Sequence, residues 1–174
     1  NCVIEEKINI KKEISILGAR SPDGEIKIFP SFRNIHKNHI LDITRLPSRT
    51  DKQTEELAVE YTIKILKKLK YIGIICIEFF IDASGNLMAN EIAPRVHNSG
   101  HITIEACKTS QFEQHLRAIT NQPLGKVDII KPAVMKNLIG NDITNINFIK
   151  SKKEFNNFKK ANLHRYYKKE TKPG

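Results

Sequence analysis

The segment from Gly73 to His101 (GIICIEFFIDASGNLMANEIAPRVHNSGH) most strongly constrains the fold of this chain. Its two arms are rich in Ile and Phe, and the dipeptide Ser84-Gly85 between them is typical of a turn. If this dipeptide forms a two-residue loop, facing positions sum to 169, so that Glu78 lies opposite Glu91. The sequence therefore predicts a β-hairpin with two opposed carboxylates.

Side chains alternate along strands, so this register assigns each residue to a face. The first face is apolar except for Asn90 and comprises Ile75, Ile77, Phe79, Ile81, Met88 and Ile92. The second face comprises Cys76, Glu78, Phe80, Ala89, Glu91 and Ala93. Opposed glutamates would have Cβ atoms roughly 4.5 to 5.5 Å apart, where like charges disfavour each other, so a cation between them is expected.

The nature of that cation stays open at this point. Two carboxylates with no His beside them on that face suit Mg²⁺, which usually takes one or two carboxylates and completes its shell with water and phosphate oxygens. The alternatives are an ion pair with Lys or Arg, both plentiful here, or one glutamate kept protonated by its neighbour.

The loop Pro94-Arg95-Val96-His97-Asn98-Ser99-Gly100-His101 follows the second glutamate. Arg95 offers a bidentate fork for phosphate or carboxylate, and the Asn-Ser-Gly turn can direct backbone amides toward an anion. A lone His97 or His101 would more often be an ordinary hydrogen-bonded histidine. Together with the glutamates, the cluster indicates a metal and phosphate site.

The segment NEIAPRVHNSGH, followed by TIEACKTSQFEQHLRAI, resembles the signature of the 5-(carboxyamino)imidazole ribonucleotide synthases. These are ATP-grasp enzymes of purine biosynthesis, and they also occur as a domain of phosphoribosylaminoimidazole carboxylases. Ala93 stands where other ATP-grasp families usually have Asn, which agrees with this pattern, whereas a related formate-dependent purine transformylase normally has Asp-Thr-Gly at 98–100. The resemblance implies a ligase that uses ATP and Mg²⁺ to join bicarbonate to 5-aminoimidazole ribonucleotide.

The resemblance also implies roles for individual residues. The metal ligands would be Glu78 and Glu91. Arg95 would stabilise the transferring phosphoryl group, and the carboxyphosphate and ribonucleotide pocket would be lined by His97, Asn98, Ser99 and His101. The nucleotide would contact Glu5, Glu6, Lys7, Ile8, Glu13, His36, Asn90 and Glu91. In the closing motif HRYYKKETKPG, Lys168 and Lys172 would meet the substrate phosphate, although Tyr167 replaces the usual Gly and Lys172 the common Arg.

Patterns elsewhere predict the flanking elements. Strands are expected at Cys2 to Ile8, Glu13 to Arg20, Glu25 to Phe29 and Ala133 to Ile139, with a loop from Asn34 to Pro47. Capping boxes at Thr50 and Ser110 predict helices to about Leu69 and to Ile119. The inward residues of the first helix would be Ala58, Tyr61, Ile65 and Leu69, widened by Ile63 and Leu66, and those of the second Phe112, His115, Leu116 and Ile119. A further helix and strand are expected over 151–161 and 163–167.

These elements give an α/β (α+β) fold: an ATP-grasp subdomain with an antiparallel sheet and flanking helices, then a small carboxy-terminal domain. The domains would be 1–122 and 123–174. The chain lacks the family's amino-terminal domain and lid and begins without Met, so we expect a piece of a longer enzyme, inactive without the missing amino-terminal half. A homodimer is compatible with the resemblance.

Composition limits the partners. The net charge is +10, but the lysines are dispersed and RNA-stacking motifs are missing, so small anionic substrates are favoured over nucleic acid. The three cysteines lack metal or redox spacing, which favours a reducing cytoplasm, and no apolar run is long enough to span a membrane. Two alternatives remain: another ATP-grasp carboxylate-amine ligase, or a non-catalytic basic binding module.

Overall fold

The computed structural model describes residues 2, 4–140, 160–164 and 166. The chain divides into two compact units, Asn1–Met135 and Lys136–Gly174, and the fold below is that of the first. The helix expected over 151–161 lies largely outside the described residues, and of the strand expected over 163–167 the described residues 163, 164 and 166 are not in a strand. In the described part, no helix has the length and apolar character needed to cross a membrane.

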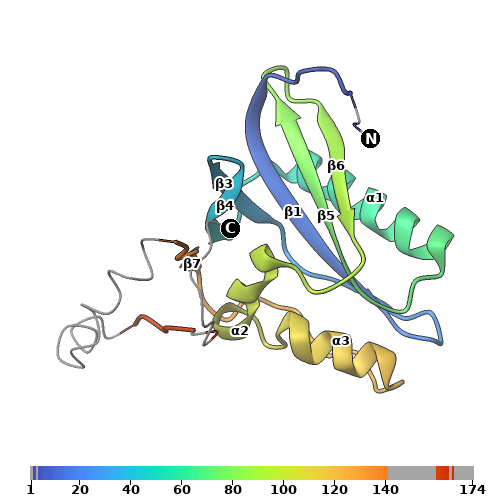
Figure 1. Cartoon of the computed structure of the whole chain (residues 1–174). Coiled ribbons are helices and arrows are strands. Elements are labelled where there is room, and N and C mark those ends of the chain that lie inside the picture. Colours follow the sequence, from blue (N-terminus) through green and yellow to red (C-terminus); the bar gives the residue numbers. More distant parts are fainter. Residues whose placement is uncertain (1, 3, 141–159, 165, 167–174) are drawn as a thin grey trace. The chain divides into compact units, whose positions relative to one another are not determined.

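Strands and helices follow one another along the chain in a mixed pattern (Figure 1). The elements are β1 (Ile10–Arg20), β2 (Ile26–Ile28), β3 (Phe32–Lys37), β4 (Ile40–Leu46), α1 (Lys52–Leu69), β5 (Gly73–Asp82), β6 (Leu87–Ala93), η1 (Asn98–Ile102), α2 (Thr103–Ala106), α3 (Gln111–Ile119) and β7 (Ala133–Lys136). The sheet order is β6-β5-β1-β3-β4-β7, with β2 also paired to β1. The pairs β1-β2, β1-β3, β1-β5, β3-β4 and β5-β6 are antiparallel, which confirms the predicted fold class.

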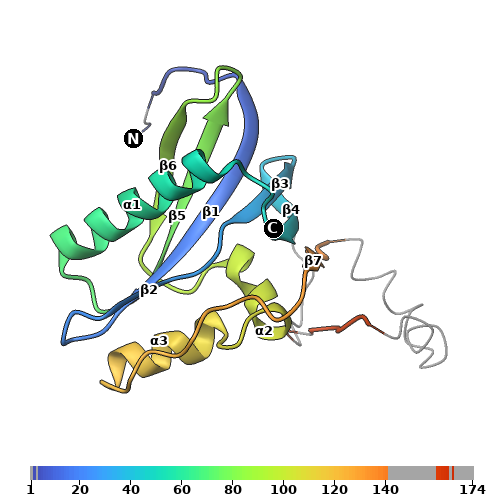
Figure 2. The ribbon, with the colours of Figure 1, turned by 180° about the vertical axis from the view of Figure 1, so that it is seen from behind.

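The central strand β1 carries different cores on its two faces because its side chains alternate. Ile14 and Ile16 face α1, where they pack with Ile75, Ile77 and Phe79 of β5. Figure 2 shows α1 lying across this face of the sheet. The predicted apolar face of β5 is therefore confirmed, and it packs against the helix.

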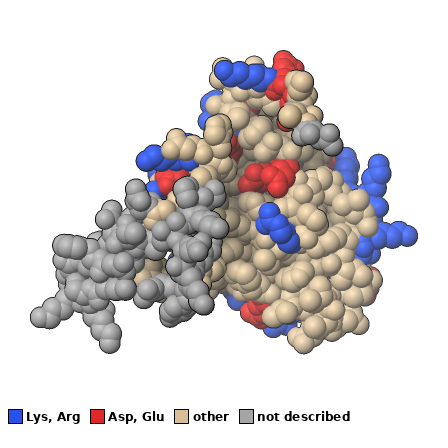
Figure 3. Space-filling view, viewed as in Figure 1, with Lys and Arg blue, Asp and Glu red and all other residues tan. Residues whose placement is uncertain are grey.

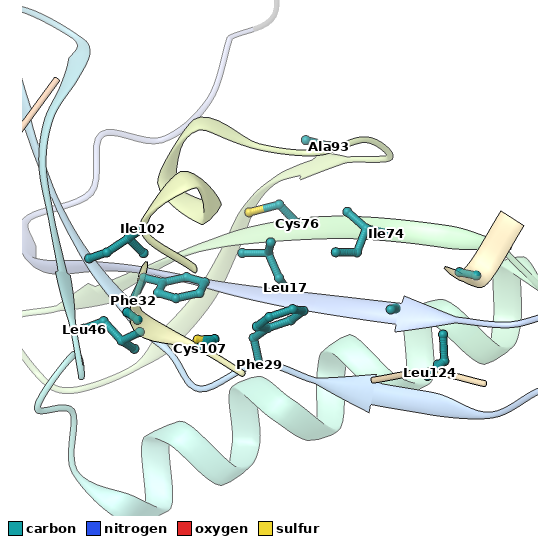
Figure 4. Packing of buried hydrophobic residues seen from close by; sticks show 13 residues of the cluster. Leu17, Phe29, Phe32, Leu46, Ile74, Cys76, Ala93, Ile102, Cys107 and Leu124 are labelled. Carbon is teal, nitrogen blue, oxygen red and sulfur yellow. The ribbon is translucent and has the colours of Figure 1, made fainter. Parts of the chain in front are cut away.

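The opposite face of β1 packs on the segments that follow the hairpin. Leu17 contributes to a second cluster with Phe29, Phe32, Cys76 and Ile102 (Figure 4). Farther along the same face of β1, the residues are the polar Glu13 and Ser15 instead. This face is thus apolar at one end and polar at the other, and the polar end positions the candidate site.

Three sequence predictions about elements are wrong. Residues 4–9 form no strand, because their charged side chains are exposed and gain nothing from burial. The segment from Asn34 to Pro47 is largely the hairpin β3-β4, whose turn residues Asn38 and His39 both have positive φ angles (51° and 63°), as a type I′ turn requires. The first helix is capped by Asp51, whose side chain accepts a hydrogen bond from the Thr54 amide, and not by Thr50.

The predicted inward faces of both helices also need correction. On α1 the prediction holds in part: Ala58 and Leu66 are buried, and Tyr61 and Ile65 are half-buried against the same core. The exceptions are Leu69, which is 59% exposed, and Thr62, which is buried although it was not predicted. On α3 the fully buried residues are Gln111, Gln114 and Ala118, while Phe112, Leu116 and Ile119 are exposed. The polar Gln side chains are buried because the loops around α3 satisfy their hydrogen bonds.

Candidate functional site

The hairpin β5-β6 brings the two glutamates together. Glu78 is the cross-strand partner of Glu91, as predicted from the sequence. The turn, however, has three residues: Asp82 pairs with Asn86 and accepts a hydrogen bond from the Gly85 amide, and Gly85 has a φ angle of 90°. This loop shifts the register by one residue near the turn.

A β-bulge restores the register before the glutamates. Phe80 faces Met88 and Ile81 faces Leu87, but beyond the irregularity at Asn90 the pairing returns to Glu78 with Glu91. Met88 therefore lies on the same face as Glu78. Leu87 packs in the core beneath α1, at the place predicted for Met88. The expected pairing of Ile81 with Met88 is wrong, whereas the carboxylate pair is correct because the two irregularities compensate.

The two carboxylates have no basic neighbour within ion-pair distance in the described residues apart from His97. Its Nε2 atom lies 3.6 Å from Oε1 of Glu78. Burial raises the pKa of Glu78, and the Glu91 and Glu13 carboxylates raise it further, although His36 and Arg95 act in the opposite direction. Among the residues that the structure describes, neither carboxylate forms the Lys or Arg ion pair considered from the sequence.

The space-filling view shows acidic side chains gathered near the middle of this face (Figure 3). Among the described residues, no three His, Cys, Asp or Glu side chains cluster as metal ligands. Two carboxylates are nevertheless enough for Mg²⁺, which draws its other ligands from water and phosphate oxygens. The donor set therefore fits a hard divalent cation that arrives with a phosphate ligand.

The loop after β6 is held by buried contacts from α3. Gln111 bonds both backbone groups of His97: its Oε1 accepts from the amide at 3.0 Å, and its Nε2 donates to the carbonyl at 2.8 Å. Gly100 packs so closely on this side chain that an added Cβ would lie 2.3 Å from Oε1 of Gln111 and 2.6 Å from Cδ2 of Leu17. The loop is thus fixed against β1 and α3, and His97 with it.

The imidazole of His97 is largely buried and neutral. Burial and then the Arg95 guanidinium lower its pKa to about 4. Its Nδ1 lies 2.9 Å from the buried hydroxyl of Ser99, which is itself 2.9 Å from the hydroxyl of Ser15. Ser99 is fully buried, so its hydroxyl contacts Ser15 and His97 and does not face solvent.

The other predicted residues are distributed around this cluster. Glu13 forms an ion pair with Nδ1 of His36, and this contact raises the pKa of His36. Nδ1 of His101 lies 2.9 Å from the His97 carbonyl, and Asn98 begins η1. Arg95 is exposed at the same loop, and Asn90 is the bulge residue of β6.

Some predicted residues are not brought to the cluster. Glu5, Glu6 and Lys7 are exposed and Ile8 is half-buried, all in the extended segment before β1. Lys168 and Lys172 lie outside the described residues.

Sequence reasoning missed Ser15, Asn34 and Gln111, which are all buried and polar. Asn34 donates to Ser15 at 3.0 Å, which places both residues in contact with the candidate site through Ser99. A signal existed for Ser15, because Glu13 and Ser15 lie two residues apart in a strand and so share one face, next to the apolar run that follows. Gln111 carried no such signal.

A family model described as the ATP-grasp domain matches residues 1–112. The N5-carboxyaminoimidazole ribonucleotide synthase of Bacillus subtilis (strain 168) is 40% identical over 173 residues, which cover 99% of this chain and 44% of that protein. This chain therefore spans less than half the length of that relative.

Solved structures agree with this match. The N5-carboxyaminoimidazole synthetase of Staphylococcus aureus complexed with ADP has a TM-score of 0.87 at 44% identity, covering 97% of this chain and 44% of that one. The synthase of Aspergillus clavatus in complex with ADP and 5-aminoimidazole ribonucleotide has a TM-score of 0.75 at 29% identity, covering 83% of this chain and 41% of that one.

Proposed function

The chain belongs to the ATP-grasp family, and from this premise we propose that it is part of a 5-(carboxyamino)imidazole ribonucleotide synthase. Such an enzyme couples ATP cleavage to carboxylation of 5-aminoimidazole ribonucleotide by bicarbonate. The observation that carries the proposal is the opposed pair Glu78 and Glu91 beside a rigidly held loop with two imidazoles. Similarity to synthases over nearly the whole chain supports it.

The cofactors we propose are ATP and Mg²⁺. Glu78 and Glu91 would hold the metal, which would neutralise phosphate charge and orient the triphosphate. The opposed carboxylates support this assignment, because like charges at that separation disfavour each other and the described residues place no Lys or Arg at ion-pair distance from them. We also propose that Asn90, Glu13, His36 and the segment 5–8 contact the nucleotide.

The remaining assignments concern the substrates. Arg95 is exposed at the edge of the glutamate pair, where its guanidinium could stabilise charge on a transferring phosphoryl group. His97, Asn98, Ser99 and His101 would shape the pocket for carboxyphosphate and the ribonucleotide. Lys168 and Lys172 would meet the substrate phosphate. In this proposal residues 1–122 belong to the ATP-grasp domain and 123–174 to a small carboxy-terminal domain.

A chimaera tests the function, because this chain spans only 44% of its relatives. Residues 1–174 replace the aligned part of the Bacillus subtilis relative, and ADP release is measured with bicarbonate, formate or an amino acid, each with and without 5-aminoimidazole ribonucleotide. We expect turnover that requires both bicarbonate and the ribonucleotide, and none from residues 1–174 alone.

Turnover with formate or an amino acid, and none with bicarbonate, would instead favour another ATP-grasp ligase. A folded chimaera that binds no MgATP and retains only salt-sensitive binding to arbitrary DNA or RNA would favour the basic binding module. The unmodified Bacillus subtilis relative serves as the positive control, and thermal melts verify that the chimaera is folded.

A further inference from the structure

A continuous line of buried hydrogen bonds runs from β4 to the imidazole of His97. The hydroxyl of Thr44 donates to Oδ1 of Asn34 at 3.2 Å, and Nδ2 of Asn34 donates to Oγ of Ser15 at 3.0 Å. Oγ of Ser15 lies 2.9 Å from Oγ of Ser99, which lies 2.9 Å from Nδ1 of His97. We call this line of five residues the polar chain. Its four members other than His97 are at most 4% exposed, so water does not compete for their hydrogen bonds.

One fixed donor sets the direction of every bond in the polar chain. The backbone amide of Ser99 points at Nδ1 of His97, 3.4 Å away, and a backbone N–H can only donate. Nδ1 must then be an acceptor, so the Ser99 hydroxyl donates to it and accepts from Ser15. Ser15 in turn accepts from the Asn34 amide, which leaves the Asn34 oxygen to accept from Thr44.

This direction determines where the single proton of neutral His97 resides. Because Nδ1 accepts, the proton is on Nε2, the atom that faces Oε1 of Glu78 at 3.6 Å. A proton on Nδ1 would oppose both the Ser99 amide and the Ser99 hydroxyl. The same contact opposes an imidazolium, which would carry N–H groups on both ring nitrogens.

We propose that Ser15 and Asn34 are positioning residues, which through Ser99 hold His97 as the neutral Nε2–H tautomer and so present a hydrogen-bond donor beside Glu78. A neutral donor can orient a carboxylate without adding positive charge, whereas an imidazolium would repel a cation held by the same carboxylate. In this assignment His97 is not a general base at Nε2. The effect on turnover rests on the proposed function, but the tautomer does not.

The tautomer is measured directly by NMR on residues 1–174 labelled with ¹⁵N-histidine, at neutral pH without metal. The spectrum of His97→Gln assigns the His97 signals. We expect an unprotonated Nδ1 and a protonated Nε2 in the parent chain. A protonated Nδ1 in the parent overturns the proposal.

Two serine variants test the polar chain itself. Ser15→Ala removes its central hydroxyl, so the Ser99 hydroxyl loses the partner that orients it. Nδ1 of His97 is then held as an acceptor only by the long 3.4 Å contact from the Ser99 amide, so a measurable fraction of the Nδ1–H tautomer should appear. Ser48→Ala is the matched control, because Ser48 is also buried but its hydroxyl bonds Ser31 and Thr50 away from the polar chain. If Ser15→Ala fails to fold, Ser99→Ala replaces it with the same expectation. Identical His97 spectra for Ser15→Ala and Ser48→Ala would refute the role of Ser15.

Activity is measured in the chimaera with the same pair of variants. Ser15→Ala should lower kcat about fivefold, the size expected from one net hydrogen bond, while Ser48→Ala should match the parent. An inactive parent chimaera with the expected tautomer defeats the proposed function and leaves the positioning intact. An active chimaera whose His97 carries its proton on Nδ1 defeats the positioning alone.

Discussion

Replacing Gly100 by Ala tests how tightly the loop after β6 is fixed. The new methyl group would lie 2.3 Å from Oε1 of Gln111 and 2.6 Å from Cδ2 of Leu17, whereas ordinary contacts begin at 3.4 Å. Something must therefore move by about 1 Å, a displacement that can cost on the order of 10²-fold in turnover. Gln111 cannot move alone, because it bonds the amide and carbonyl of His97. We expect a loss of roughly 2 to 4 kcal/mol in stability, from overpacking and about one lost hydrogen bond.

The assay is urea unfolding of residues 1–174 carrying Gly100→Ala, Gln111→Ala or both, together with kcat of the corresponding chimaeras. If the clash is with Gln111, truncating that side chain relieves it, so the double variant should be less destabilised than the sum of the two single variants. Strictly additive effects, or a change below about 0.5 kcal/mol for Gly100→Ala, would show that the loop accommodates a side chain and that our account of its rigidity is mistaken.

Three further predictions concern charge and thiols. In the chimaera, Glu91→Gln should lower kcat by about 10² to 10³ because a metal ligand is lost, and it should not lower the metal-free melting temperature because repulsion between the carboxylates is relieved. A destabilised metal-free protein with normal Mg²⁺ dependence would contradict the metal site. Lowering the pH from 6.5 to 4 should reduce the stability of residues 1–174 by up to about 3 kcal/mol through His97, because the unfolded histidine binds a proton that the folded one, with a pKa of about 4, does not bind. Urea titrations at stepped pH measure this loss as the difference between the parent and His97→Gln. In mass spectrometry, exposed Cys2 should be alkylated at once, whereas Cys76 and Cys107 should react only in denaturant, because burial raises the pKa of both thiols (Cys107 to about 11). Prompt labelling of all three cysteines would contradict the described core.

The hairpin with its glutamates could be predicted because two apolar arms around a Gly-containing turn are a strong local signal. Its irregularities could not: nothing in the sequence distinguishes a two-residue loop from the three-residue turn ending at Gly85, or marks Asn90 as a bulge. The glutamate pairing was correct because the two deviations cancel. The neighbouring prediction for Met88 was wrong because it lies between them.

The elements that escaped prediction are those whose inward residues are polar. The hairpin β3-β4 was expected to be a loop because Asn34 and Thr44, which belong to the polar chain, interrupt the apolar alternation. The buried face of α3 was misassigned for the same reason, since Gln111 is fully buried. Hydrophobic periodicity detects burial in apolar surroundings, and it fails where a site needs buried hydrogen bonds.

The bulge at Asn90 also constrains how this hairpin can change length during evolution. A deletion confined to the turn would move every following residue of β6 by one place and turn Glu91 away from Glu78, because adjacent strand residues point to opposite faces. A deletion in the turn accompanied by loss of the bulge residue would leave the pair unchanged. Gaps at the turn and at Asn90 should therefore occur together in alignments of homologous chains.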